Sequence, residues 1–166
     1  MYDALPARLY YNAGQVPPAA HTRNTEQTQR DSSQEKPAVL VVDDHATIRE
    51  VLAVILEDGG YRVCECADGG PALRQLRASR EPMVVLLDME MPGMDGFQVM
   101  QAVAADAALA TRHAYVLVTA NATTLPLAFV TLLSRLGVPI IPKPFDIDEL
   151  MEAVAQAAAR LGQRLA

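Results

Sequence analysis

The sequence predicts a doubly wound α/β domain, in which helices cover both faces of a five-stranded parallel sheet. Short, continuous apolar runs recur between residues 37 and 166, which is typical of strands buried on both faces of a parallel sheet. Segments with apolar residues at helical spacing separate these runs. Glycine and proline stand at many of the boundaries between the two kinds of segment.

The elements can be assigned in chain order. Ala38 to Val42 forms an uninterrupted apolar strand, and a helical pattern follows from Ile48 to Leu56. Gly59 and Gly60 end this helix, as glycine does at a C-terminal cap. Tyr61 to Ala67 is the second strand. The remaining strands are expected at 83–87, 114–118 and 138–142, and the remaining helices begin near Pro71 and lie at 97–108, between 124 and 136, and at 147–161. Pro71 suits a first helical turn, and Asp146 or Asp148 is the expected N-cap of the last helix.

The first 36 residues differ in composition from the rest. Gln15 to Lys36 is rich in Gln, Thr, Ser, Asn and Pro and poor in large apolar side chains, so it cannot bury enough surface to offset the entropy of ordering. We expect a disordered tail over 1–36 and a single domain over 37–166. Met1 to Tyr11 can be interpreted in two ways, as a short docking motif or as an unstructured terminus.

Charge and composition exclude several classes of function. The 166 residues carry a formal net charge of -6, which argues against a nucleic-acid-coating surface, because phosphate backbones require clustered Lys and Arg. The two cysteines, Cys64 and Cys66, provide no disulfide framework. No apolar run reaches the roughly 18 residues that a membrane span needs, and no secretory leader opens the chain. We therefore expect a soluble, cytoplasmic protein that contacts neither nucleic acid nor membrane.

Chemically functional side chains follow four of the five strands. Asp43 and Asp44 come directly after the first strand, Asp88 after the third, Thr119 after the fourth and Lys143 after the fifth. The functional crevice of such sheets lies at the carboxyl ends of the strands, so these five side chains are expected in one site. A single Asp at a strand end is most often a turn residue or a helix cap, but this combination favours a functional site.

The residue types of this site suit phosphoryl chemistry. Three carboxylates in one small site repel each other, and a hard divalent cation with oxygen ligands, Mg²⁺, resolves that repulsion. Lys143 adds a second positive charge. An Asp carboxylate can act as a nucleophile towards phosphorus, while a metal and a lysine stabilise the transferring oxygens. The Thr119 hydroxyl can then donate to the attached phosphoryl group.

The sequence resembles the receiver domain of two-component response regulators, a CheY-like family with a flavodoxin-like (βα)₅ fold. The resemblance covers about 38 to 163, and the stretches that carry it are VLVVDD at 39–44, LLDMEMPGMDG at 86–96, VTA at 118–120 and KPF at 143–145.

The resemblance implies roles for the site residues. Asp88 takes a phosphoryl group from a phosphohistidine on a histidine kinase or phosphotransfer protein. Asp43 and Asp44 hold Mg²⁺, with Asp44 favoured as the direct ligand, together with Asp88 and the backbone carbonyl of Glu90. Thr119 and Lys143 contact the phosphoryl group. The resemblance also implies a cis peptide bond before Pro144 and a tight turn at Gly96.

The chain departs from the family at three positions. Ile140 stands where members usually carry Tyr or Phe on the fifth strand, so the aromatic rotation coupled to Thr119 cannot operate. Glu90 and Asn121 occupy two positions thought to tune the lifetime of the phosphoryl group. Glu90 adds negative charge at the mouth of the crevice.

The helix within 124–136 is unusually apolar, since the segment contains five leucines and one valine besides Phe129 and leaves little polar face. An apolar outer face marks an interaction site, so we expect a homodimer or output contact through this helix, the fifth strand and the last helix. The alternative is that the helix begins later, at Pro126.

Three functions remain to be compared. We expect a phosphoacceptor switch rather than an enzyme, and because no output module follows Ala166, the signal is expected to leave through a protein surface or by onward phosphoryl transfer. An aspartyl-phosphate phosphatase would place its acid-x-acid motif on the first strand, whereas Asp88 and Glu90 follow the third. A pseudo-receiver that switches by binding alone would not need the intact set of acids, Thr119 and Lys143.

Overall fold

The computed structural model describes residues 36–165, and these form a five-stranded, all-parallel sheet in the order β2-β1-β3-β4-β5. The strands are β1 (Ala38–Val42), β2 (Val63–Cys66), β3 (Met83–Asp88), β4 (Ala114–Thr119) and β5 (Ile140–Pro142). The helices are α1 (Ala46–Asp58), α2 (Gly69–Ala78), α3 (Gly96–Ala105), α4 (Ala107–Arg112), α5 (Leu127–Leu136) and α6 (Ile147–Leu165), with a 3₁₀ turn, η1, at Ala122–Thr124. The predicted fold class is confirmed. The tail prediction, apart from Lys36, lies outside the described residues.

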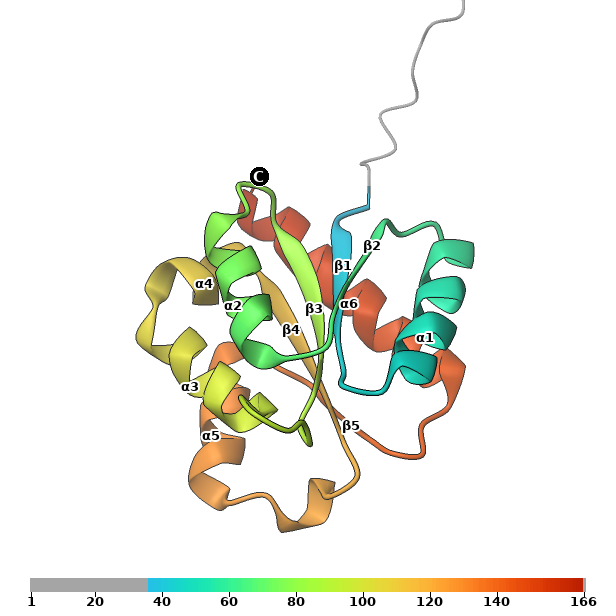
Figure 1. The fold of residues 1–166 in the computed structure, drawn as a ribbon. Coiled ribbons are helices and arrows are strands. Elements are labelled where there is room, and N and C mark those ends of the chain that lie inside the picture. The colour runs from blue at the N-terminus through green and yellow to red at the C-terminus, as the bar shows by residue number, and fades with distance from the viewer. Residues whose placement is uncertain (1–35, 166) are drawn as a thin grey trace, which may run out of the picture. The chain divides into compact units, whose positions relative to one another are not determined.

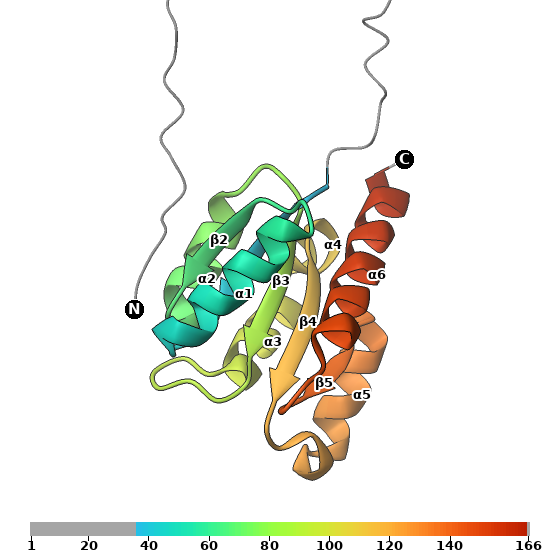
Figure 2. The same cartoon turned by 90° about the vertical axis from the view of Figure 1, so that its right-hand side faces the viewer.

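Helices cover both faces of the sheet (Figures 1 and 2). One apolar cluster joins α1 and α6 to the sheet through side chains such as Val41 and Leu86. The other joins α2, α3, α4 and α5 to the opposite face through Leu40 and Leu87. Successive strand residues point to opposite faces, so continuous apolar runs serve both clusters. All of β1 and β3 is buried, which explains why these strands lack polar alternation.

Two predicted boundaries were wrong for identifiable reasons. The helix expected at 97–108 is two helices, because the Asp106 side chain accepts from the amides of Ala108 and Leu109 and so caps a new helix, α4. The second strand begins at Val63 rather than Tyr61, because the Tyr61 amide donates to the Leu56 carbonyl and still belongs to the turn that ends α1.

The end of the chain also differs in detail from the prediction. The fifth strand begins at Ile140, two residues later than expected, and α6 continues past 161 to Leu165. Of the two predicted caps, Asp146 is supported, since its Oδ1 accepts from the Asp148 amide at 2.8 Å. Within the described range, no helix is long and apolar enough to cross a membrane.

The expected apolar outer face of the helix before β5 is largely absent. Phe129 and Leu133 are buried in the core, and Leu132 and Leu136 pack partly against it. Leu127, which is 81% exposed, is the one large apolar side chain of α5 that points mainly to solvent. The helix starts at Leu127, after Pro126, as the alternative reading of its boundaries required.

Candidate functional site

The acid pair follows β1 where this buried strand leaves the sheet. The Asp43 side chain is only 4% exposed, and its Oδ1 accepts from the His45 amide at 2.8 Å. Arg49, on the first turn of α1, donates from Nη1 to the Asp43 carbonyl at 2.7 Å and from Nε to Glu65 at 3.3 Å. These contacts fasten the loop to α1 and β2. Arg49 was not predicted from the sequence, although its place in the first turn of the helix after the acid pair was a usable signal.

Asp88 ends β3 beside the acid pair, and Lys143 connects the two. The Lys143 ammonium lies 2.9 Å from Oδ1 of Asp88 and 3.3 Å from Oδ2 of Asp43. The Asp88 side chain is 2% exposed, whereas Lys143 is 22% exposed and reaches inward from the residue after β5. The peptide bond between Lys143 and Pro144 is cis, as the family resemblance implied. Three side chains from separate strand ends are therefore in direct contact.

The charges of this cluster are incompletely balanced. Burial raises the pKa of Asp88 above its ordinary value of 3.8, although the hydrogen bond and the charge of Lys143 oppose this shift. Burial also acts to lower the pKa of Lys143, but the Asp88 and Asp43 carboxylates outweigh it and leave that pKa above the ordinary 10.5. Lys143 is thus a permanent cation at neutral pH. One ammonium faces three carboxylates, and the excess of two negative charges matches one divalent cation.

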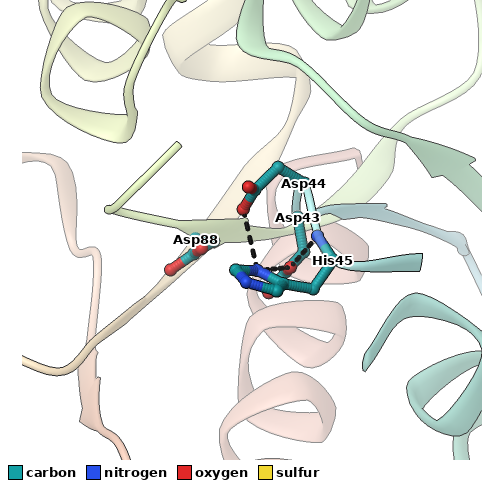
Figure 3. A group of neighbouring side chains, drawn as sticks. All are labelled: Asp43, Asp44, His45 and Asp88. Atoms are coloured by element: carbon teal, nitrogen blue, oxygen red, sulfur yellow. Dashed lines mark hydrogen bonds and ion pairs between the residues drawn. The ribbon is translucent and has the colours of Figure 1, made fainter. Parts of the chain in front are cut away.

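The donor set fits a hard cation. Atoms of Asp43, Asp44, His45 and Asp88 that could bind a metal lie within 4.8 Å of one another, and Figure 3 shows these side chains grouped at the strand ends. Oδ1 of Asp44 is buried and has no hydrogen-bond partner, although it lies 3.0 Å from Nδ1 of His45. A buried carboxylate oxygen without a donor is costly unless something else satisfies it. Carboxylate ligands of this kind suit Mg²⁺.

Thr119 and Glu90 form a second group beside the acids. Thr119 is fully buried at the end of β4, and its hydroxyl donates to Oε1 of Glu90 at 2.6 Å. Ala120 N–H and Asn121 Nδ2 also donate to the Glu90 carboxylate, at 3.4 and 3.1 Å. Burial acts to raise the pKa of Glu90, but these hydrogen bonds outweigh it and lower the pKa below the ordinary 4.5. Glu90 is therefore ionised at neutral pH. The negative charge of Glu90 at this site was expected from the sequence, but its contact with Thr119 was not.

The predicted site residues thus come together in two neighbouring groups. Asp43, Asp88 and Lys143 are in contact, Asp44 adjoins them, and Thr119 is joined to Glu90. The Glu90 amide donates to Oδ1 of Asp88 at a long 3.4 Å and connects the groups. Gly96 packs closely against the backbone of Asp88, because a Cβ at residue 96 would lie 2.6 Å from the Asp88 carbonyl oxygen. The turn at Gly96 is required by close packing and not by a positive φ.

Comparison with known proteins identifies similar chains. The family model described as "Response regulator receiver domain" matches residues 39–155. The DNA-binding response regulator MtrA of Mycobacterium tuberculosis is 37% identical over 123 residues, which is 74% of this chain and 50% of that protein. The DNA-binding transcriptional regulator NtrC of Escherichia coli is 33% identical over 129 residues, 72% of this chain and 24% of that protein. The chain therefore spans half or less of the length of these relatives.

The structural comparison agrees with the sequence comparison. A CheY-like response regulator receiver domain protein from Methanospirillum hungatei superposes with a TM-score of 0.66 at 31% identity, covering 76% of this chain and 98% of that one. The shared region is thus nearly the whole of that receiver domain protein.

Proposed function

Because this chain belongs to the response regulator receiver domain family, we propose that it is a phosphoacceptor switch in which Asp88 receives a phosphoryl group. The observation that carries this proposal is the contact of one lysine, Lys143, with both Asp88 and Asp43 at the carboxyl edge of the sheet. That arrangement provides a buried carboxylate with a fixed positive charge beside the position that a transferred group would occupy.

The proposed step is a phosphoryl transfer between two side chains. A carboxylate oxygen of Asp88 forms a bond to phosphorus, and the phosphorus–nitrogen bond of a phosphohistidine breaks, returning the electron pair to the imidazole. Lys143 stabilises the charge on the phosphoryl oxygens, and the Thr119 hydroxyl donates a hydrogen bond to one of them. Asp43, Asp44, Asp88 and the Glu90 carbonyl would hold Mg²⁺, which would neutralise charge on the same oxygens when bound.

The phosphoryl donor is a histidine kinase or a histidine-containing phosphotransfer protein, in keeping with response regulators as a class. We propose that the protein carries the signal as a cytoplasmic phosphoprotein and does not turn over a substrate as an enzyme. The phosphorylated domain would signal through contacts with other proteins.

Covalent labelling tests this proposal. We expect acetyl phosphate with Mg²⁺ to add one phosphoryl group to the wild-type chain, as measured by intact mass, and to add none to Asp88→Asn. Asp58→Asn is the matched control, because Asp58 is an exposed acid at the far end of α1. Labelling of Asp88→Asn equal to that of the wild type would contradict the proposal.

We propose the surface formed by α5, β5 and α6 as the output or homodimer surface, although Leu127 is the one large apolar side chain of α5 that is mainly exposed. Leu127 is its most exposed large apolar side chain, so we expect Leu127→Asp to weaken self-association of the beryllofluoride-bound protein. Light scattering over a range of protein concentrations measures this, with Val54→Asp on α1 as the control, since Val54 is 67% exposed on another helix. A mass that stays monomeric at all concentrations, with and without beryllofluoride, would exclude the homodimer.

A further inference from the structure

The Glu90 side chain occupies donors that lie beside the phosphoacceptor. The Thr119 hydroxyl and the Asn121 side-chain amide donate to its Oε1, and the Ala120 backbone amide donates to its Oε2. Both carboxylate oxygens are therefore engaged, and the shortest contact, at 2.6 Å, is with Thr119. Carboxylate and phosphoryl oxygens are both anionic acceptors that form charge-assisted hydrogen bonds with the same kinds of donor.

Thr119 cannot serve two anions at once. Its hydroxyl has a single proton to donate, and its oxygen already accepts from the Asn121 amide at 3.0 Å. Because Thr119 is fully buried, its side chain has little freedom to find another partner. A phosphoryl group that binds this hydroxyl must take it from Glu90.

We propose that Glu90 is a tethered competitor of the phosphoryl group, whose carboxylate must leave Thr119 and Ala120 before a phosphoryl group on Asp88 can bind there. This inference rests on the function proposed above. The Glu90 amide lies 3.4 Å from the Asp88 carboxylate, so the competing side chain extends from the backbone beside the phosphoacceptor itself. Charge repulsion between the phosphoryl group and Glu90 then favours release of the carboxylate.

The displaced side chain has open space to enter. Glu90 is exposed and lines an open surface groove together with Met91, Pro92, Asn121 and Leu125. Its departure would change the charge and shape of that groove when Asp88 is loaded. The half-buried Ile140 packs against the core and has no aromatic ring that could rotate with Thr119. Movement of the Glu90 side chain would thus couple the hydrogen bonding of Thr119 to the surface groove without an aromatic residue on β5.

Beryllofluoride, a phosphoryl mimic, tests the competition directly in the full chain at saturating Mg²⁺. The amide resonances of Ala120 and Asn121 follow its titration into the wild type, Glu90→Ala and Glu90→Asp. We expect Glu90→Ala to lower the beryllofluoride midpoint about 10-fold, because no carboxylate has to be displaced from a charge-assisted hydrogen bond. Glu90→Asp keeps the negative charge but is one methylene too short for the present contact, so its midpoint should approach that of Glu90→Ala.

Glu57→Gln is the matched control, because it removes one negative charge from an exposed position near the C-terminal end of α1. Its beryllofluoride midpoint should equal that of the wild type. Equal midpoints in the wild type and Glu90→Ala would overturn the competition. A wild-type midpoint in Glu90→Asp, with tighter binding by Glu90→Ala alone, would assign the effect to general repulsion and also overturn it. Absence of any response in both the wild type and Glu57→Gln would instead refute the proposed phosphoacceptor function.

Discussion

Lys143 and His113 show how single side chains shape this domain. Lys143 neutralises part of the charge on Asp88 and Asp43, which would otherwise be costly to bury together. His113, at the opposite edge of the sheet, is buried without a counter-charge. Its Nδ1 accepts from the Met83 amide at 3.2 Å, so its Nε2 carries the proton and donates to the Leu76 carbonyl at 3.1 Å. This pair of bonds requires the neutral imidazole.

The folded domain should therefore lose stability as His113 is forced to protonate. Burial lowers the pKa of His113 below its ordinary 6.5, so between the two values the unfolded chain binds a proton that the folded chain does not. The contribution to stability is fully present above about pH 6.5 and falls by up to about 1.4 kcal/mol per pH unit below it. Urea unfolding between pH 5 and 8 measures this slope.

The His113→Gln variant should unfold with a smaller slope below pH 6.5, whatever its absolute stability. His45→Gln is the control, because the His45 side chain is 65% exposed and lies away from that network. A His113→Gln slope identical to that of the wild type would show that another group causes the pH dependence.

At the scale of the elements, the strands were easier to predict than the helices. The continuous apolar runs at 38–42, 83–87 and 114–118 are typical of strands buried on both faces, and the observed strands match them to within one residue. The break between α3 and α4 was missed because it depends on one side chain, Asp106, which caps α4 instead of facing solvent within a longer helix. Periodicity does not detect such local hydrogen bonding.

The start of α3 must pass close to the end of β3, and Gly96 permits this approach. We expect Gly96→Ala to lower the free energy of unfolding by about 1–3 kcal/mol, because its Cβ would lie 2.6 Å from the Asp88 carbonyl oxygen and 2.8 Å from Cα of Met89. The same displacement should weaken Mg²⁺ binding, since it moves the backbone that carries Asp88. Urea unfolding and calorimetric Mg²⁺ titration measure the two effects.

Gly70→Ala provides the comparison for that substitution. Its Cβ would lie 3.4 Å from Oδ1 of Asp68, which is an ordinary contact distance, and Gly70 stands in the first turn of α2. We expect a change in unfolding free energy within about 1 kcal/mol. A Gly96→Ala protein as stable as Gly70→Ala would mean that the chain relaxes there without cost.

For the molecule as a whole, topology explains why the site could be predicted in part. A parallel sheet brings the ends of all its strands to one edge, so Asp43, Asp88 and Lys143 had to converge once the strands were assigned. The contact between Glu90 and Thr119 could not be foreseen in this way. It depends on how two loops of different length meet, and a flexible glutamate side chain can reach several partners from the same backbone position.

The same arrangement separates two ends of the domain with different roles. Carboxylates and Lys143 gather where the strands end, while the structural network of His113 connects α2, β3 and the residue before β4 at the other edge. Substitutions at His113 should therefore change stability and leave the acidic cluster intact, whereas substitutions at Asp88 should act mainly on that cluster.

The central claim is that Asp88, its neighbouring acids and Lys143 form one metal-dependent phosphoryl site, and amide NMR of a beryllofluoride titration tests it most directly. With Mg²⁺ present, we expect the resonances of residues 43–45, 88–90, 119–121 and 143–145 of the wild type to shift together. No such shift is expected without Mg²⁺ or in Asp88→Ala. Shifts that persist unchanged in Asp88→Ala, or a wild-type spectrum that does not change when beryllofluoride and Mg²⁺ are added, would contradict the claim.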